Sequence, residues 1–462
     1  MATPTLVHRV RVIDQFRVTP PSGSVPETHL PLTFFDVIWD RSVTVQRIFF
    51  FDLSSSSHTK SHFLSTQLPN IKQSLSLALQ RFYPLAATLA PSPQTGHNEF
   101  HYTDGDSVQL TVAESDSDFH ALVADHPKDT AEFHPLVPEL GSSDLSSFQL
   151  TVFADSGFSI GLTVRHVAAD GSSIMQFMKY WAWVCRLGDE SDSMNLPSPI
   201  YDRDLIPDPM GLKPILLDQI SMREQMWKEI GIKLEAQQKE HMVRATFVLS
   251  RANIEDLRHR VAAARMEDTG KRDPLHVSSF VLTCGYMWAC LTKARGHVGD
   301  RTIHFCFAVD CRARMSPPIS AAYFGNCIWA CHASVEGSEI ASVKDNEGLV
   351  AAFEVIGRAI QRLDDDGVLN GADQRFPRIC ATVDKGEPIL SVAGSPRLRV
   401  YNVDFGFGRP RKVEVISIEE TGAMSLAESR EDGGRGIEVG LALPESEMER
   451  VASLFKEGLG AH

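Results

Sequence analysis

The sequence predicts a mixed α/β protein with two domains. The chain has 462 residues, of which 43% are hydrophobic, and a single hydrophobic core stops growing at roughly 250 to 300 residues. Patterns typical of strands and of helices occur in both halves of the chain. Between the halves, residues 187–211 are rich in Asp, Ser and Pro. This composition indicates a linker, so we expect domains over 1–187 and 216–462 joined by a linker over 188–215.

The first half is expected to begin with a buried strand and a helix. The apolar run that ends in Ile48-Phe49-Phe50-Phe51 is typical of a buried strand. A helix is predicted to follow and to end at Tyr83-Pro84, because four apolar residues share one helical face: Ile71, Leu75, Leu79 and Phe82. Residues 91–146 are polar and rich in turn residues, with a predicted strand at 107–112.

The first half closes with a strand, a turn and a helix around His166. Alternate apolar residues form a row on one side of a strand that ends at His166, namely Phe158, Ile160, Leu162 and Val164. After the turn at Asp170-Gly171 the spacing becomes helical, with Ser172 and Ser173 available as N-cap residues. Such a junction is well placed to face a cleft. A histidine that ends an apolar row is nevertheless more often a hydrogen-bonded core residue.

The second half is expected to begin with a charged amphipathic helix over 214–239 and a strand over 245–249. An apolar helix is predicted at 278–294 and a strand at 302–309. Near the C-terminus, three segments indicate an antiparallel set of strands, namely 400–404, 412–416 and 436–443. A closing helix should bury Met448, Val451, Phe455 and Leu459.

Charge and composition exclude several classes of partner. The formal net charge is −14 and the isoelectric point is near 5.6, which disfavours a nucleic-acid backbone or an anionic membrane surface as a partner. The N-terminal segment lacks the apolar stretch of a secretory signal, and no run approaches the roughly 18 apolar residues of a membrane span. We therefore expect a cytoplasmic protein with no nucleic acid and no membrane partner.

The cysteines predict neither disulfides nor a metal site. None of the eight cysteines forms a Cys-x-x-Cys pair, so we expect reduced, buried thiols. Cys327 with Cys331, or His166 with Asp170, would supply fewer ligands than the three or four that a zinc site needs. We expect no bound metal.

Two further motifs are misleading in their context. Residues 157–161 match G-x-S-x-G, the nucleophile elbow of serine hydrolases, but the strand alternation continues through Ser159, where an elbow requires a sharp turn. Gly406-Phe407-Gly408 begins a dinucleotide-binding pattern, yet Arg411 stands where the third glycine belongs. Neither a serine nucleophile nor a dinucleotide site is expected.

Two signatures in a fixed order point to a family. His166-Val-Ala-Ala-Asp170 is followed about 230 residues later by Asp404-Phe405-Gly406-Phe407-Gly408. The pair resembles the HxxxD and DFGWG signatures of the plant BAHD acyl-CoA-dependent acyltransferases. Other stretches similar to this family lie at 32–36, 81–86 and 309–312, so the likeness covers nearly the whole chain. Residues 323–327 and 393–397 are similar to motifs of the branch that acylates flavonoids and anthocyanins, which includes many malonyltransferases.

This resemblance implies a fold and an activity. The fold would consist of two chloramphenicol-acetyltransferase-like α/β domains joined by a long crossover loop, with the active site in a channel between them. The activity would be transfer of a malonyl or hydroxycinnamoyl group from acyl-CoA to a hydroxyl of a phenolic or flavonoid glycoside. Acyl-CoA would be a co-substrate, no cofactor would be bound permanently, and the protein would be a monomer. The alternative is a catalytically silent relative that only binds ligands or partners.

The resemblance also implies roles for the first signature. His166 would be the general base, because a neutral imidazole with an ordinary pKa near 6.5 accepts a hydroxyl proton at cytosolic pH. The hydroxyl would then attack the thioester directly in a ternary complex. Asp170 could orient the imidazole, as in a triad. The resemblance instead favours a structural ion pair with an arginine, for which we expect Arg312.

The second signature is expected to be structural. Asp404 would be structural, and Gly406 and Gly408 would allow close backbone packing where a tight bend is needed. Phe407 stands where the family usually has tryptophan, so the indole N–H is absent although aromatic packing can persist. Arg165 is a second departure, since histidine or asparagine is common before the catalytic histidine.

The residues that would recognise the donor are less defined. Arg409, Arg411 and Lys412 could meet the phosphates of coenzyme A, but a basic trio beside a strand is more often a solvated edge. A malonyl carboxylate would need a facing cation, and Ser172 stands where relatives often have lysine or arginine. The malonyl assignment therefore depends on Gly394-Ser395-Pro396 alone.

Overall fold

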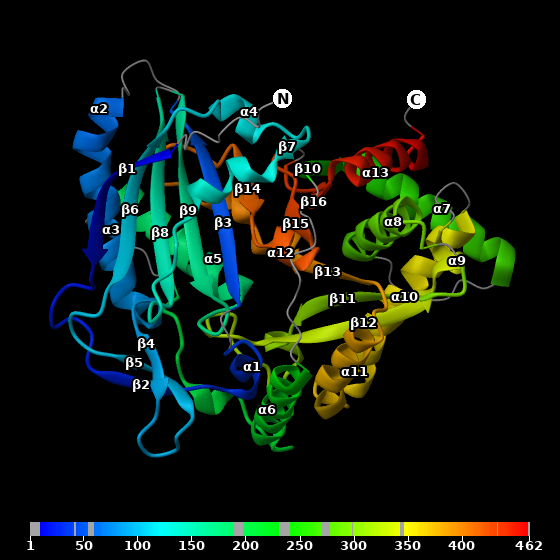
Figure 1. Ribbon diagram of the computed structural model, residues 1–462, viewed down its shortest axis with the longest axis horizontal. Coiled ribbons are helices and arrows are strands. Elements are labelled where there is room, and N and C mark those ends of the chain that lie inside the picture. Colours follow the sequence, from blue (N-terminus) through cyan, green and yellow to red (C-terminus); the bar gives the residue numbers. More distant parts are fainter. Residues whose placement is uncertain are drawn as a thin grey trace.

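The computed structural model describes residues 10–40, 43–53, 60–154, 156–188, 197–230, 241–269, 278–297, 299–341, 346–431 and 433–460. Two large mixed sheets stand side by side, each covered by helices (Figure 1). The first sheet has the order β1 (Val10–Val18), β6 (Val108–Ser115), β8 (Ser146–Phe153), β9 (Gly157–Arg165), β3 (Thr44–Asp52) and β14 (Lys412–Val415). The second has the order β12 (Ile328–Glu336), β11 (Thr302–Asp310), β13 (Ile389–Gly394), β15 (Met424–Glu428), β16 (Ile437–Pro444), β10 (Met242–Leu249) and β7 (Lys128–Asp129).

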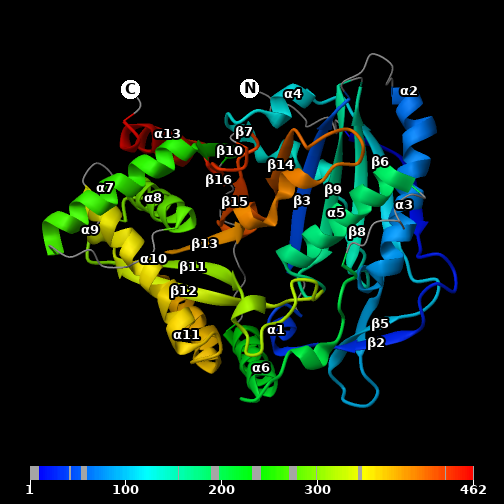
Figure 2. The same ribbon diagram turned by 180° about the vertical axis from the view of Figure 1, so that it is seen from behind.

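Helices α3 (Leu68–Arg81) and α5 (Gly171–Leu187) pack against each other on one face of the first sheet (Figure 2). Their apolar faces are buried as the helical spacing predicts, and Trp181 of α5 donates a hydrogen bond to the Ile71 carbonyl of α3. Leu136, in the 3₁₀ turn His134–Leu136, lies against the other face of this sheet beside Gly161. The short helices α1 (Phe34–Val37), α2 (Lys60–His62) and α4 (Phe119–Val123) lie around the sheet.

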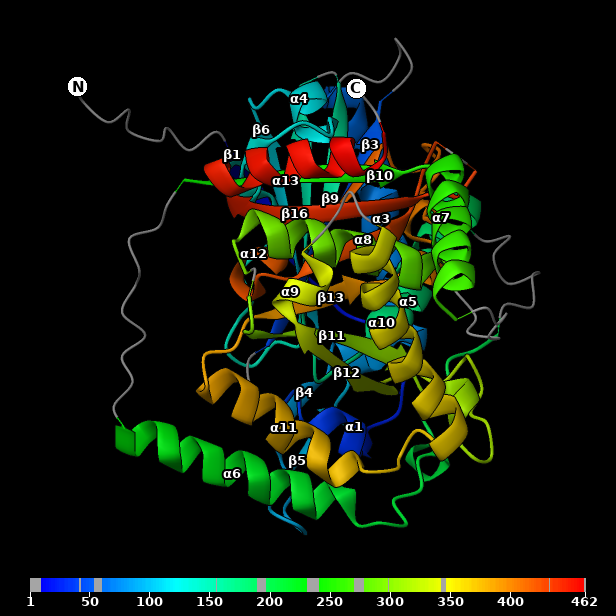
Figure 3. The ribbon, with the colours of Figure 1, turned by 90° about the vertical axis from the view of Figure 1, so that its right-hand side faces the viewer.

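The second sheet is covered by α7 (Arg251–Thr269), α8 (Ser279–Ala294), α10 (Asn346–Asp366) and α13 (Glu445–Gly458), with the short α9 (Gly337–Ile340) beside them (Figure 1). Helix α8 is buried almost all round, which explains its continuous apolar sequence. Helices α6 (Leu212–Ile230) and α11 (Ala372–Asp384) pack together at one edge of the molecule (Figure 3). Helix α12 (Ile418–Thr421) follows β14, and a small sheet of β2 (Thr28–Pro31), β5 (Asn98–Tyr102) and β4 (Thr88–Pro91) completes the fold.

Most expected elements are confirmed, with three corrections. The segment expected as a strand at 400–404 forms the 3₁₀ turn Val400–Asn402, because the Glu428 carboxylate accepts both the Val400 and Tyr401 N–H groups. The segments at 412–416 and 436–443 are strands, but β14 pairs with β3 of the first sheet and β16 lies in the second. The N-cap of α5 is Asp170 rather than a serine.

Two strands cross between the halves of the chain. Strand β14, from the C-terminal half, extends the first sheet, while β7, from the N-terminal half, pairs with β10 in the second. The division into 1–187, 188–215 and 216–462 stays a prediction, with these two exchanged strands as exceptions to it. Residues 189–196 of the linker and 231–239 of the expected helix lie outside the described residues. Within the described residues, no helix has both the length and the apolar composition that spanning a membrane would require.

Candidate active site

His166 lies directly after β9, at the junction predicted from the strand alternation. Its backbone N–H donates to the Val43 carbonyl at 2.8 Å, and its own carbonyl accepts a hydrogen bond from the Asn326 side chain at 2.9 Å. The imidazole stacks on the Trp39 indole, with ring centroids 3.8 Å apart and planes inclined by 12°. The backbone and one face of the imidazole are therefore both fixed.

The surroundings of His166 favour the neutral imidazole. Burial lowers the pKa of His166 below its ordinary value, and the Asn326 carboxamide and the carboxylate of Asp170 only partly oppose this effect. The Nδ1 atom is buried and has no hydrogen-bond partner among the described residues. This geometry leaves Nε2 as the nitrogen that a substrate can reach.

Asp170 belongs to a buried network that includes Arg312. Its two carboxylate oxygens bind Arg312, with N–O distances of 2.8 and 3.2 Å, and the side chains of Asp170 and Arg312 are 0% and 4% exposed. The same carboxylate accepts the Ser173 N–H of α5 and the Cys327 N–H. Asp170 thus joins the first turn of α5 to the start of β12.

Asp36 and Asn326 connect this network to the histidine. Asn326 donates its side-chain N–H groups to Asp36 Oδ1 and to the carbonyls of His166 and Val167, at 2.9 to 3.0 Å. Asp36 is held in turn by the Thr33 N–H and hydroxyl. The stretches at 32–36 and 323–327 thus meet at His166. The sequence indicated both stretches only through their likeness to the family, and no sequence pattern indicated that Trp39 lies next to His166.

The second signature forms a tight turn beside α5. Asp404 Oδ1 accepts the N–H groups of Gly406 and Gly408 at 2.8 and 2.9 Å, and both glycines have positive φ, 98° and 83°. Asp404 also forms an ion pair with Arg186 of α5 at 3.3 Å. Phe407 packs against Phe63 and Phe158, so the aromatic packing persists where the family has tryptophan.

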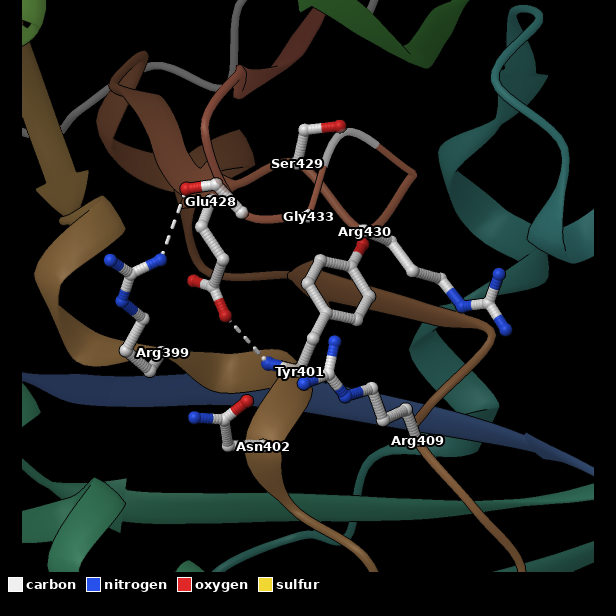
Figure 4. A pocket seen from close by; sticks show the side chains of 9 residues that line it. Arg399, Tyr401, Asn402, Arg409, Glu428, Ser429, Arg430 and Gly433 are labelled. Carbon is white, nitrogen blue, oxygen red and sulfur yellow. Dashed lines mark hydrogen bonds between the residues drawn. The ribbon is translucent and has the colours of Figure 1, made fainter.

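The three basic residues after the second signature, Arg409, Arg411 and Lys412, differ in their exposure. Arg409 lines a pocket of about 220 Å³ together with Arg399, Arg430 and Glu428 (Figure 4), and Arg411 is exposed. Lys412 is buried and its ammonium group contacts the carboxylates of Asp125 and Glu438. This placement argues against the expected role of Lys412 at a coenzyme A phosphate, because the ammonium group already has anionic partners inside the protein.

Ser159 and the cysteines, for which the sequence predicted no catalytic or metal-binding role, lie in unreactive positions. Ser159 is buried in the middle of β9, opposite Phe50 and Thr151, so no nucleophile elbow forms there. All eight cysteines are free and at least half-buried. Burial raises the pKa of the Cys185 and Cys331 thiols to about 11 and that of the Cys306 thiol to about 12, which keeps them as unreactive thiols at neutral pH.

The sequence is similar to one protein family and to several characterised plant acyltransferases. Residues 8–457 match the Transferase family. The chain is 37% identical to phenolic glucoside malonyltransferase 1 of Arabidopsis thaliana, over 97% of this chain and 98% of that protein. It is 32% identical to the malonyl-coenzyme A:anthocyanin 3-O-glucoside-6''-O-malonyltransferase of Dahlia pinnata, over 98% of each chain. It is also 35% identical to coumaroyl-CoA:anthocyanidin 3-O-glucoside-6''-O-coumaroyltransferase 1 of Arabidopsis thaliana, over 97% of each.

Solved structures show the same fold. Vinorine synthase superimposes with a TM-score of 0.71 at 19% identity, covering 96% of this chain and 98% of that one. TRI101 of F. sporotrichioides, in complex with coenzyme A and T-2, superimposes with a TM-score of 0.65 at 18% identity, covering 93% and 97%. The expected two-domain α/β fold is confirmed.

Proposed function

The chain belongs to the Transferase family, the BAHD acyltransferases, and on this premise we propose that it moves a malonyl or hydroxycinnamoyl group from coenzyme A to a hydroxyl of a phenolic or flavonoid glycoside. The observation that carries the mechanism is the partly buried imidazole of His166, whose surroundings lower its pKa and which is stacked on Trp39 and held through its backbone by Asn326. Relatives named for malonyl and coumaroyl transfer to glucosides support these two donors and this acceptor.

The reaction needs one base and no covalent enzyme intermediate. His166 Nε2 accepts the proton of the acceptor hydroxyl while the hydroxyl oxygen attacks the thioester carbon. The tetrahedral intermediate then collapses, the C–S bond breaks, and the imidazolium returns the proton to the leaving thiolate of coenzyme A. General-base help of this kind contributes about 10²–10⁴-fold to the rate, and holding both substrates together supplies much of the remainder.

The other site residues have supporting roles in this proposal. Asp170 and Arg312 fix the turn after His166, and Asp404, Gly406 and Gly408 fix the turn beside α5. Arg409 and Arg411 stay as candidates for the phosphates of coenzyme A, while Lys412 is left out because of its buried carboxylate partners. We further propose that the protein acts as a monomer in the cytoplasm, with acyl-CoA as a co-substrate and no permanently bound cofactor.

The assay that tests this function measures release of free thiol from an acyl-CoA together with the mass of the acylated glycoside. Malonyl-CoA, coumaroyl-CoA and caffeoyl-CoA are each incubated with a set of phenolic and flavonoid glucosides. We expect turnover with malonyl-CoA or with a hydroxycinnamoyl-CoA, and a mass increase that identifies the donor. If no donor is consumed with any acceptor in the set, the chain is a silent relative.

The same assay tests the base. We expect His166→Ala to lower kcat by roughly the 10²–10⁴-fold contribution of a general base, because the substitution removes the imidazole that would take the proton. The circular dichroism spectrum and the melting temperature should stay close to those of the wild type, since His166 is held mainly through its backbone. Substantial activity in a folded His166→Ala protein would contradict the assignment.

A further inference from the structure

Two histidines and a glutamate meet on the small sheet, apart from the acyltransfer site. His29 of β2 and His101 of β5 are directly opposite each other in the antiparallel pair, and their rings stack with centroids 4.2 Å apart. Glu27 Oε1 lies 3.1 Å from His101 Nε2 and 3.8 Å from His29 Nε2. One ligand atom from each residue can be chosen so that all three lie within 4.8 Å of one another.

A fourth residue, Glu99, fixes one of the histidines for metal binding. Its carboxylate accepts a hydrogen bond from His29 Nδ1 at 2.9 Å, and its side chain is only 14% exposed. A hydrogen bond at Nδ1 sets the tautomer in which the lone pair is on Nε2, the atom that faces Glu27. Metal-binding histidines in proteins characteristically have such a carboxylate behind them, and it raises the affinity of the imidazole for the metal.

Although no bound metal was expected from the sequence, we propose that Glu27, His29 and His101 form a zinc site, with Glu99 as the carboxylate that orients His29. Two imidazole nitrogens and one carboxylate oxygen are ligands that Zn²⁺ favours, whereas Ca²⁺ and Mg²⁺ require oxygen ligands. Ligand atoms on one tetrahedral zinc lie roughly 3.3 Å apart, given bonds of 2.0 to 2.2 Å. The distance from Glu27 Oε1 to His101 Nε2, 3.1 Å, is already close to this value, and the distance from Glu27 Oε1 to His29 Nε2 is 3.8 Å. The three protein ligands leave the fourth position to water.

The position of the site determines what zinc does there. The small sheet lies at the edge of the first half of the molecule, with β2, β4 and β5 at the lower left of Figure 1. Strand β2 ends two residues before Thr33, the residue that leads into α1. Zinc would link β2 to β5 and so stabilise the segment that precedes α1.

Calorimetric titration with ZnCl₂ tests the site on protein without an affinity tag, after dialysis against a chelator. We expect one zinc per chain and a rise in melting temperature. Both should be lost in His29→Ala and in His101→Ala. Glu99→Gln should bind zinc 10- to 100-fold more weakly, as carboxylates behind metal ligands typically contribute.

His97→Ala is the matched control, because His97 is an exposed histidine in the β4–β5 turn outside the cluster. It should bind zinc as the wild type does. Replacing zinc by Co²⁺ gives a second readout, since tetrahedral coordination produces a visible absorption band that His29→Ala should lack. No binding by the wild type, or equal binding by wild type and His29→Ala, would show that the cluster is only a hydrogen-bonded pair. The outcome is independent of acyltransferase activity.

Discussion

At the scale of single residues, the feature closest to the His166 imidazole is the Trp39 indole stacked on it. The indole covers one face of the imidazole and contributes to the burial that lowers the pKa of His166. A lowered pKa keeps the imidazole neutral, and therefore basic, at pH values where an exposed histidine is already partly protonated. The indole nitrogen of Trp39 is buried without a hydrogen-bond partner among the described residues, so the contribution of Trp39 to the site is the aromatic face.

This arrangement predicts a shift in the pH dependence of kcat/KM. In the wild type, kcat/KM should fall on the acid side of the profile, the acid limb, with an apparent pKa below the ordinary histidine value of about 6.5. This pKa belongs to His166 in the free enzyme, because kcat/KM reports the pKa values of the free enzyme. Trp39→Ala exposes the imidazole and should move that limb upward, towards 6.5. Trp39→Phe keeps an aromatic face and loses no hydrogen bond, so it should retain the wild-type profile. An unchanged limb in Trp39→Ala would show that the stack does not control the pKa of His166.

Asp170 and Asp310 offer a matched test of the buried network, because both bind Arg312. Asp170 is fully buried, whereas the Asp310 side chain is 48% exposed. Asp170→Asn leaves the buried guanidinium with only the half-exposed Asp310 as a charge partner, and should cost about 3–5 kcal/mol in the free energy of unfolding. Asp310→Asn should cost about 1 kcal/mol or less. Denaturant unfolding gives both values.

The same two variants separate the two roles considered for Asp170. If Asp170→Asn were as stable as Asp310→Asn but had lost its activity, Asp170 would act on the imidazole as in a triad. A large loss of stability in Asp170→Asn alone would agree with the structural role.

At the scale of elements, the periodicity of apolar residues correctly predicted those helices and strands whose formation depends on residues near them in the sequence. The alternation up to Val164 and the helical spacing after Gly171 correctly placed β9, His166 and α5. Periodicity could not show that the Asp170 side chain caps α5, because that choice depends on Arg312 and Cys327, more than 140 residues away.

The prediction of a strand at 400–404 was wrong for a related reason. Its residues favour a strand, but the Glu428 carboxylate binds the backbone N–H groups of Val400 and Tyr401 that a strand would pair. Asn326 likewise reaches His166 from a loop 160 positions later, and only the family likeness had drawn attention to that stretch. Sequence pattern therefore placed His166 at the end of β9, and the family likeness proposed it as the base, whereas the groups that hold it depend on long-range contacts.

Strand β9 provides an element-scale prediction through its glycine at 161. A Cβ atom built on Gly161 would lie 2.1 Å from the Leu136 carbonyl oxygen, which belongs to the backbone and cannot move aside like a flexible side chain. Gly161→Ala should therefore displace the His134–Leu136 turn from the sheet and destabilise the protein by several kcal/mol, at about the upper end for single substitutions.

Gly171, the first residue of α5, is the matched control for Gly161. A Cβ atom there would first meet the terminal methyl of Leu398 at 3.2 Å, which a side-chain rotation can relieve. Gly171→Ala should keep a melting temperature within a few degrees of the wild type. Equal melting temperatures for Gly161→Ala and Gly171→Ala would mean that the β9 strand and the Leu136 turn are not packed as tightly as described.

At the scale of the whole molecule, the two exchanged strands make the halves depend on each other. Glu414 of β14 is buried, and its carboxylate lies 3.4 Å from Arg244 of β10 and 3.8 Å from Lys128 of β7. Strand β14 belongs to the first sheet and the other two strands to the second, so this cluster joins the sheets. The cations beside it lower the pKa of Glu414, even though burial alone would raise it.

Glu414→Gln removes the carboxylate and leaves Arg244 and Lys128 as buried cations without this partner. We expect a loss of about 3–5 kcal/mol in the free energy of unfolding at neutral pH, with no change in the acid limb assigned to His166. Because the folded-state pKa of Glu414 is lowered, its stabilisation is present above the unfolded value of about 4.5 and is lost as the pH falls through the folded value. The stability difference between wild type and Glu414→Gln should therefore shrink with acidification below pH 4.5. Glu420→Gln, at an exposed site in α12, should leave stability nearly unchanged.

Because the cluster joins the two sheets, thermal unfolding of the wild type should be a single transition by both tryptophan fluorescence and circular dichroism. Two separated transitions in the wild type would mean that each half folds on its own and that the exchanged strands do not couple them.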